Sequence, residues 1–588
     1  MSSLFLWIII FLNMFSKKTY SPENIYHLVG VTLISNPSLT ILLFILIISG
    51  IFTWGKIFED VINWIKKHNP ITYTLSKYEE YYKCGEYDNA LLALESKSIW
   101  KHFPLYKYLI NKLAANTYLI YGKEKLCFQS IEKAYVYAQS EERKIELNKI
   151  KIQLFIIAGS VNSAKEILKD MKNNPDISSY QTFSHFEALI LEKHGLLEES
   201  ISKLKSASDL FNKNESQELF VIYNNLGRIS GILKNHTDQV IFYEKAKDIL
   251  SSKSSKYQRH IIYQNLIDSY LYSRNLEKSD LLLNEYYDII DLQNKHDLLE
   301  YYNYLLRFYR QTENSNAFIN TINLMHKYLD PLLTKEEQLS TNIHELSFCF
   351  NNIGLNLGLL QKIKTDFSLY SKFNLKEKLL AFQIIFKNIT SPDGSRHLHP
   401  FEEMHKYIFN FLRNSFSEIE LYIKNELENF QIYEKCWLLE QKVWLFNFQP
   451  HNSVNLYSLI QQKLKLIDEI SSIYSYSGNV ILSLESKLNL VDECMGSLQN
   501  HLTPEQSQSI KDQMLSSFEK VESEIQPYLN HPEMPPSFLR LSRYSLFLNK
   551  QDLAKLYLDR FLELGISINH FSNYIQNYYF SVYNNFYS

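Results

Sequence analysis

One short stretch in the second half of the chain gathers side chains that could hold a metal ion. It reads RHLHPFEEMH from Arg396 to His405. The metal-ligating types in it are His397, His399, Glu402, Glu403 and His405. Three imidazoles and a carboxylate could fill a tetrahedral or facial site. If a helix begins at Pro400, Glu402 and His405 lie three residues apart on one of its faces.

The same stretch also has an ordinary structural explanation. Ligands this crowded in sequence rarely converge without a second segment, and Glu402 and Glu403 suit the positive end of a new helix. We therefore predict a polar loop and a helix start without a metal, and keep His397, His399 and His405 as the weak candidate ligands.

Other patterns of catalytic residues are missing from the sequence. There is no phosphate-binding G-x-x-x-x-G-K-[ST] loop, no G-x-S-x-G nucleophile elbow, no H-E-x-x-H and no closely spaced cysteine pair. The five cysteines are far apart, as is typical of thiols in a reducing compartment. We predict that the chain is not an enzyme and carries no cofactor.

Composition points to helices joined by short loops. The 588 residues include only 15 Gly and 14 Pro, which are too few for the turns of α/β or all-β folds. A net charge of -3, without a long basic run, argues against nucleic-acid binding. With 45% hydrophobic residues, the chain has ample apolar surface for a core, and it is not a disordered sequence.

The N-terminal region has the character of a membrane anchor. Residues 38–55 read SLTILLFILIISGIFTWG, and a helix of that length rises about 27 Å, close to the hydrocarbon thickness of a bilayer. We predict a transmembrane helix over 38–55. The shorter apolar run 4–15 is either the first helix of a hairpin or an interfacial helix, so one or two membrane passes remain open.

The lysines near the predicted span favour one orientation. Lys56, Lys66 and Lys67 follow it, whereas only Lys17 and Lys18 precede it. This small excess favours a cytoplasmic C-terminal body at an inner or plasma membrane.

A regular repeat follows the anchor. Several segments share a helix, a turn residue and a second helix with a small residue near its start. The turn residues are Gly85, Gly122, Gly159, Gly195, Lys234, Arg274 and Thr312. They recur every 36 to 40 residues, which indicates stacked helical hairpins that bury a continuous core.

These units resemble the tetratricopeptide repeat (TPR) family, whose unit is a hairpin of about 34 residues. The best match reads YNNLGRISGILKNHTDQVIFYEKAKDIL from Tyr223 to Leu250. Leu226 and Gly227 match the family's Leu-Gly pair, and Tyr243 and Ala246 match its aromatic and small positions. Other alanines at small positions are Ala90, Ala134, Ala164, Ala188 and Ala207. The resemblance implies an all-α solenoid with a concave binding surface.

The predicted organisation has three parts. Residues 1–67 form the membrane anchor, 68–375 the TPR-like solenoid, and 376–588 an irregular helical region. The last part contains one more TPR-like hairpin at 541–565, with Ala554 at a small position. The segments Thr334-KEE and Thr503-PEQ are typical of capping boxes at helix starts.

The resemblance also suggests ligand-binding residues. Asn224 and Arg228 lie on the first helix of the best repeat, at positions that face the concave groove in TPR proteins. We predict that they bind a peptide backbone or carboxylate.

Three functions follow from these features. The first is a membrane-tethered scaffold or adaptor whose concave surface binds a protein or peptide partner, a layout similar to that of bacterial inner-membrane TPR proteins. The second is a regulatory sensor, for example in bacterial defence or signalling, whose N-terminal helices act on the membrane. The third is a metal-dependent enzyme using residues 397–405. We prefer the first.

Overall fold

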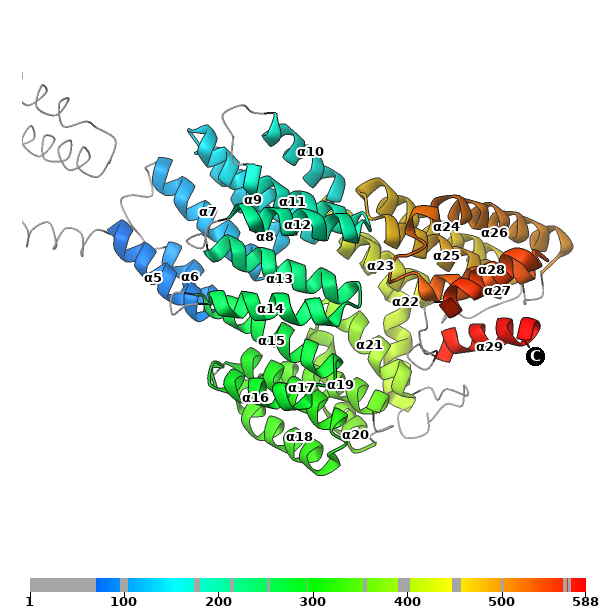
Figure 1. Cartoon of the computed structure of the whole chain (residues 1–588). Coiled ribbons are helices and arrows are strands. Elements are labelled where there is room, and N and C mark those ends of the chain that lie inside the picture. The colour runs from blue at the N-terminus through cyan, green and yellow to red at the C-terminus, as the bar shows by residue number, and fades with distance from the viewer. Residues whose placement is uncertain are drawn as a thin grey trace, which may run out of the picture. The chain divides into compact units, whose positions relative to one another are not determined.

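The computed structural model describes most of the chain from residue 70 to residue 587. The stretches left out are 96–103, 174–179, 212–215, 251–253, 293, 353–356, 390–401, 447–455, 499–501, 564–567 and 569–572. Within the described residues every regular element is a helix, so the predicted all-α class is confirmed (Figure 1).

Contacts divide the described residues into two units. Residues 70–79 and 93–95 fall in one unit, and residues 80–92 and everything from 104 onward fall in the other. The second unit contains the hydrophobic clusters and the two sites described below.

The described part of the chain begins with ten helices, which extend to residue 249. They are α5 (Pro70–Cys84), α6 (Tyr87–Leu94), α7 (Pro104–Ile120), α8 (Glu124–Tyr135), α9 (Glu141–Ala158), α10 (Val161–Lys172), α11 (Tyr180–Lys193), α12 (Leu197–Leu210), α13 (Ser216–Ile232) and α14 (His236–Ile249).

The middle helices carry the chain to residue 389. They are α15 (Lys256–Tyr272), α16 (Leu276–Tyr287), α17 (Lys295–Gln311), α18 (Ser315–Leu329), α19 (Lys335–Asn352), α20 (Leu357–Asp366) and α21 (Leu375–Ile389), with the short 3₁₀ helices η2 (Asp330–Leu332) and η3 (Phe367–Lys372).

The last helices complete the described chain. They are α22 (Glu402–Asn425), α23 (Ile432–Leu445), α24 (Leu456–Ser477), α25 (Val480–Ser497), α26 (Pro504–Glu524), α27 (Pro535–Phe547), α28 (Gln551–Glu563) and α29 (Asn573–Tyr587), with the 3₁₀ helix η6 (Gln526–Tyr528).

Hairpin turns recur at the spacing seen in the sequence. The residue at each turn has a positive φ: Gly85, Gly122, Gly159, Gly195, Lys234, Arg274 and Glu313. Six of the seven predicted turn residues are thus confirmed. In the seventh turn the left-handed residue is Glu313, one residue after the predicted Thr312. The chain reverses between the two helices of a hairpin through a left-handed residue just after the first helix. This residue ends the backbone hydrogen bonding of that helix. Gly478 and Asn549 repeat the device in the C-terminal region.

Small residues let the helices of each hairpin approach closely. All the alanines that the sequence places at small positions, including Ala246 and Ala554, are fully buried. A Cβ on Gly227 of α13 would lie 2.6 Å from the Tyr243 ring of α14, so only glycine fits this contact without a shift. Gly227 and Tyr243, two of the residues on which the resemblance rests, are therefore packing partners.

Helix starts follow the local sequence signals. Thr503 and Gln506 form a reciprocal capping box before α26, with Pro504 in its first turn. Thr334 and Glu337 make the same pair of bonds before α19, at 2.9 and 3.2 Å. Both predicted capping boxes are confirmed.

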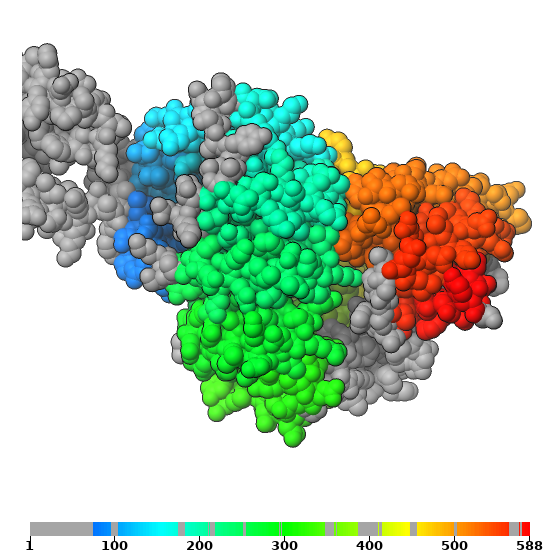
Figure 2. Space-filling view, viewed as in Figure 1, coloured from blue at the N-terminus to red at the C-terminus, as the bar shows by residue number. Residues whose placement is uncertain are grey.

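The turns at Gly159 and Gly478 pack against each other although they are far apart in sequence. Asn479 donates from its amide to the Gly159 carbonyl oxygen at 2.6 Å and accepts from the Tyr433 hydroxyl at 2.7 Å. Asn162 donates to the Tyr476 carbonyl oxygen at 2.6 Å. We call these contacts the turn junction. In the space-filling view the surface of α24 meets the surface around α10 (Figure 2).

An aromatic cluster extends the turn junction. The Phe430 ring stacks on Phe128 of α8, with 4.6 Å between ring centroids, and lies 6.0 Å from Phe155 of α9. Ser160 donates to the Phe430 carbonyl oxygen at 3.3 Å. Because Phe430 is buried among these groups, the segment just before α23 is held against α8 and α9.

No described helix has both the length and the hydropathy needed to cross a bilayer. The predicted membrane segments, 4–15 and 38–55, lie outside the described residues.

The left-handed turns predict opposite effects for two substitutions. Gly122 has a φ of 65°, and no atom lies within 4 Å of the point where an alanine Cβ would stand, so Gly122→Ala tests backbone strain alone. We expect it to lower the free energy of unfolding by about 1 kcal/mol. Lys234→Gly relieves the strain of a non-glycine residue at φ 58° and should raise it by up to about 1 kcal/mol. Urea unfolding of the full-length chain gives both values, and shifts of the same sign would contradict the argument.

The turn junction predicts a larger loss at Asn479. Asn479→Ala removes the bonds to Gly159 and Tyr433 and leaves a buried carbonyl and a hydroxyl unsatisfied, which should lower the free energy of unfolding by about 2 kcal/mol. The matched control is Asn111→Ala, since the Asn111 amide bonds only within its own helix, to the Lys107 carbonyl oxygen. Equal losses in the two variants would mean that the turn junction adds nothing.

Candidate functional site

The predicted binding residues Asn224 and Arg228 lie one turn apart on α13, and both already have partners. Arg228 makes a bidentate ion pair with Glu192 of α11, with 2.6 Å between Nη2 and Oε2. The Glu192 side chain is only 6% exposed, whereas that of Arg228 is 38% exposed. The ion pair is therefore buried on its carboxylate side and open on its guanidinium side. The predicted role of these residues in ligand binding stays a prediction.

Asn224 takes part in a hydrogen bond that links α13 to α15. The Asn265 amide donates to the Asn224 side-chain oxygen at 2.8 Å. Close to Arg228 lies the His185 ring, whose Nδ1 is buried and makes no hydrogen bond within the described residues. Burial, reinforced by the Arg228 charge, lowers the pKa of His185 to about 4, so this imidazole is neutral at physiological pH.

Three first helices share one sequence pattern at the place where Asn224 and Arg228 lie. The segments are YNNLGR from Tyr223, YQNLID from Tyr263 and YNYLLR from Tyr302. Each ends six residues before the left-handed residue of its hairpin. The charged residue at the end alternates from Arg228 to Asp268 to Arg307. We call this row the inner polar row.

One ion pair joins two neighbouring members of the row. Arg307 of α17 pairs with Asp268 of α15, and the Tyr304 hydroxyl donates to the same carboxylate at 3.3 Å. Sequence reasoning found Asn224 and Arg228 but missed Asn303 and Arg307, their equivalents two repeats later. The signal was present, because the same six-residue pattern returns after 79 residues.

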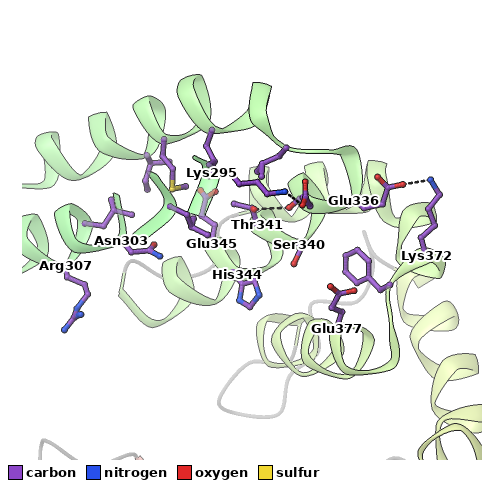
Figure 3. A pocket seen from close by; sticks show the side chains of 18 residues that line it. Lys295, Asn303, Arg307, Glu336, Ser340, Thr341, His344, Glu345, Lys372 and Glu377 are labelled. Carbon is purple, nitrogen blue, oxygen red and sulfur yellow. Dashed lines mark hydrogen bonds and ion pairs between the residues drawn. The ribbon is translucent and has the colours of Figure 1, made fainter. Parts of the chain in front are cut away.

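Asn303 and Arg307 line the larger of the two described cavities, an open groove of about 700 Å³ among α17, α18, α19 and α21 (Figure 3). We call it the groove. Its lining residues are Lys295, Leu299, Asn303, Leu306, Arg307, Ile322, Met325, Leu329, Leu333, Glu336, Glu337, Ser340, Thr341, His344, Glu345, Lys372, Phe373 and Glu377.

The floor of the groove is apolar and firmly packed. Leu306, Met325, Leu329 and Phe373 line the groove and are buried. Leu299, Ile322 and Leu333 add partly exposed apolar surface. An open apolar surface of this kind favours the burial of an apolar group from a ligand.

The charged groups around the groove are largely neutralised by one another. Lys295 pairs with Glu337, and Lys372 pairs with Glu336. Glu377 accepts from the Asn374 backbone N–H at 3.0 Å at the start of α21. The bonds to Lys295 and Lys372 lower the pKa of Glu337 and of Glu336, so both carboxylates stay ionised. A charged ligand therefore finds few unpaired counter-charges here.

Three polar side chains at the groove remain able to bond a ligand. Asn303 and Ser340 make no side-chain hydrogen bond within the described part of the chain. Burial lowers the pKa of His344, which keeps its ring neutral and able to donate or accept. In Figure 3 His344 and Glu377 lie on the same side of the groove, and Arg307 lies at the opposite end from Lys372.

His326, which does not line the groove, bonds Glu345, which does. His326 of α18 bonds Glu345 of α19 through Nε2 at 2.8 Å and Asp330 through Nδ1 at 3.2 Å. Lys362 of α20 lies 3.9 Å from Asp330. The bond to Glu345, together with the bond to Asp330, raises the pKa of His326. The imidazolium thus ties α18 to α19.

The candidate metal ligands are not brought into a described site. His397 and His399 lie outside the described residues, and His405 lies on α22 with its side chain undescribed. Among the side chains that are described, no group of three or more acidic, histidine or cysteine residues could hold a metal. Three of the described cysteines, Cys127, Cys436 and Cys494, are buried, and burial raises the pKa of each thiol to about 12.

Comparison with known proteins adds no relative: no known family and no curated protein matches this sequence.

The histidine behind the groove predicts a pH dependence of stability. A folded pKa above the ordinary value of about 6.5 stabilises the fold fully below that pH, and the contribution is lost as the pH rises through the folded pKa. The free energy of unfolding should therefore fall as the pH increases above about 6.5, and this fall should be weaker in His326→Gln. Urea unfolding at pH 6 to 8, below the range in which unfolded thiols ionise, tests this, and parallel profiles of the two proteins would contradict it.

Proposed function

We propose that this chain is a membrane-tethered helical-repeat adaptor that binds a protein or peptide partner without catalysis. In this proposal the helical hairpins form a TPR-like solenoid, the N-terminal segment 38–55 holds it in an inner or plasma membrane, and the partner docks at the cytoplasmic face. The observation that carries the proposal is the groove, with its apolar floor and internally paired rim.

The repeat geometry supports the solenoid. Left-handed turns follow one another every 36 to 40 residues, and the small positions of the hairpins are buried. Each hairpin exposes an apolar side that only its neighbours can cover, so a stack of hairpins is the expected outcome. The tether rests on the sequence alone, because an 18-residue run without charge is long enough to cross a bilayer.

The chemistry of the groove defines the partner. An apolar side chain would be buried against Leu306, Met325 and Phe373, each of which faces the groove. Asn303 and Ser340 would then bond the main chain on either side of that anchor. Because the rim charges are already paired, a strongly charged peptide gains little, so we expect an uncharged segment with one or two aliphatic or aromatic anchors.

A substitution that fills the groove tests the proposal. Ser340→Arg places a long side chain across the apolar floor, whereas Thr365→Arg adds the same charge on the exposed side of α20, away from the groove. We expect the full-length chain in mild detergent to capture a stoichiometric partner, identified by mass spectrometry. Affinity for the purified partner should fall at least about tenfold in Ser340→Arg and stay unchanged in Thr365→Arg.

Two outcomes would count against an adaptor that uses this groove. If both variants bind the partner equally, the partner docks elsewhere. If no partner is captured at all, the regulatory sensor becomes the better function, and the turn junction is the observation that favours it. A ligand that changes the contact between Gly159 and Asn479 would alter the path of the helices between them. Membrane permeabilisation that depends on residues 4–15 would then be the measurement to make.

A further inference from the structure

One carboxylate in the wall of the groove depends on a histidine that lies outside it. Glu345 of α19 lines the groove (Figure 3), and its side chain is only 8% exposed. Within the described part of the chain its one ion pair is with His326 of α18, whose Nε2 lies 2.8 Å away. A carboxylate so withdrawn from water needs its counter-charge, so the protonation of His326 decides how stable Glu345 is in this place.

The bonds of His326 require a protonated ring. Its Nε2 faces the Glu345 carboxylate, and its Nδ1 faces the Asp330 carboxylate at 3.2 Å. An ionised carboxylate only accepts hydrogen bonds, and only the imidazolium has an N–H on both ring nitrogens. A neutral ring would keep one donor and turn the lone pair of the other nitrogen toward a carboxylate. The three side chains therefore fit together in one protonation state and not in the other.

Charged groups on three neighbouring elements act on the ring. The hydrogen bond to Glu345 of α19 raises the pKa of His326 most, while burial lowers it. Asp330 of η2 raises this pKa further, and Lys362 of α20 lowers it. Lys362 lies 3.9 Å from Asp330, so Asp330 keeps a cation beside it when the ring is neutral, whereas Glu345 does not. Loss of the proton is therefore felt mainly at Glu345.

The contact between α18 and α19 has few other links. In the described chain, α18 packs extensively on its hairpin partner α17 but approaches α19 at few positions. Gln338 of α19 donates to the Asp330 carbonyl oxygen at 2.7 Å, and this bond between uncharged groups does not change with pH. The bond between His326 and Glu345 is thus an important part of what holds the two helices together.

We propose that His326 is a pH-operated latch on the wall of the groove. Its imidazolium holds Glu345 in the wall and α18 against α19, which keeps the apolar floor ready for an apolar anchor. When the ring loses its proton, Glu345 turns toward the water in the groove and the contact between α18 and α19 loosens. The inference rests on the proposed function for its ligand, and it predicts that partner binding weakens as the pH rises from 6 to 8.

Hydrogen–deuterium exchange of the full-length chain in mild detergent tests the latch without a ligand. Exchange in α18 and α19 is measured at pH 6 and pH 8 and corrected for the intrinsic pH dependence of amide exchange. We expect the protection of these helices to be at least about fivefold lower at pH 8, because their local opening becomes more favourable. The α24–α25 hairpin contains no histidine and should keep its protection within about twofold.

Three variants assign the effect to His326. His326→Gln has no charge, so α18 and α19 should be weakly protected at both pH values. His326→Lys stays positive throughout this range, so these helices should keep the same protection at pH 6 and pH 8. His236→Gln is the matched control, since His236 bonds the uncharged Gln239 at the start of α14, and it should leave the pH response of α18 and α19 unchanged.

Each result decides for or against the latch. A loss of protection at pH 8 that is confined to α18 and α19, and that both His326 variants abolish, supports it. Equal protection at the two pH values, an equal loss in α24–α25, or a loss that persists in either His326 variant would overturn it.

The adaptor function fails or stands by a different result. Partner capture and the effect of Ser340→Arg, both at pH 6, test the adaptor alone. A captured partner that binds equally at pH 6 and pH 8 would overturn the latch and leave the adaptor in place. If no partner is captured, the adaptor fails, and the exchange experiment still decides whether the latch exists.

Discussion

The structure depends above all on the turn junction, where a single side-chain amide joins two turns. Asn479 bonds the carbonyl of Gly159, a residue 320 positions earlier in the sequence. Glycine is needed at residue 159 for its φ of 87°, and the Tyr433 ring lies only 3.0 Å from where a Cβ would stand. The start of α10 and the end of α24 therefore lie next to each other. The bond to Gly159, the Tyr433 hydroxyl and the Phe430 ring together fix where that path closes.

The inner polar row lies along this path. The Glu192 carboxylate is withdrawn from water and must find a partner, which is Arg228 on the next first helix. Arg307 and Asp268 form a second pair between neighbouring first helices, and both of these side chains are partly exposed. Each arginine thus has a partner of opposite sign on an adjacent first helix. Consecutive hairpins are held in register by these pairs as well as by their apolar contacts.

The two cavities differ in how completely their charges are matched. Around the groove, Lys295 and Lys372 each have a carboxylate partner, so the apolar floor dominates what can bind. In the cavity among α23, α24, α25 and α27, Lys463 pairs with Glu493 and Arg540 pairs with Asp492, whereas Glu440 is exposed to water.

Features that depend on neighbouring residues could be predicted from the amino-acid sequence. Scarcity of Gly and Pro predicted an all-α chain, and the capping boxes at Thr334 and Thr503 predicted helix starts, because these signals act within one turn of helix. The turn at Gly122 could be located from the sequence because a left-handed residue is most often glycine. The turn at Glu313 was placed one residue early, at Thr312. The Asn224 and Arg228 positions followed from the repeat, and Asn303 with Arg307 could have followed from it too.

Which of these residues meet depends on the packing of the folded chain. The turn junction joins residues 320 positions apart, and their meeting depends on how all the helices between them pack. No local pattern encodes that packing. The pairing of Arg228 with Glu192 has the same origin, since whether a charge finds a partner is set by neighbours on other helices. Local interactions fix where each helix and turn lies in the sequence, whereas burial and charge matching between distant helices fix where a ligand can bind.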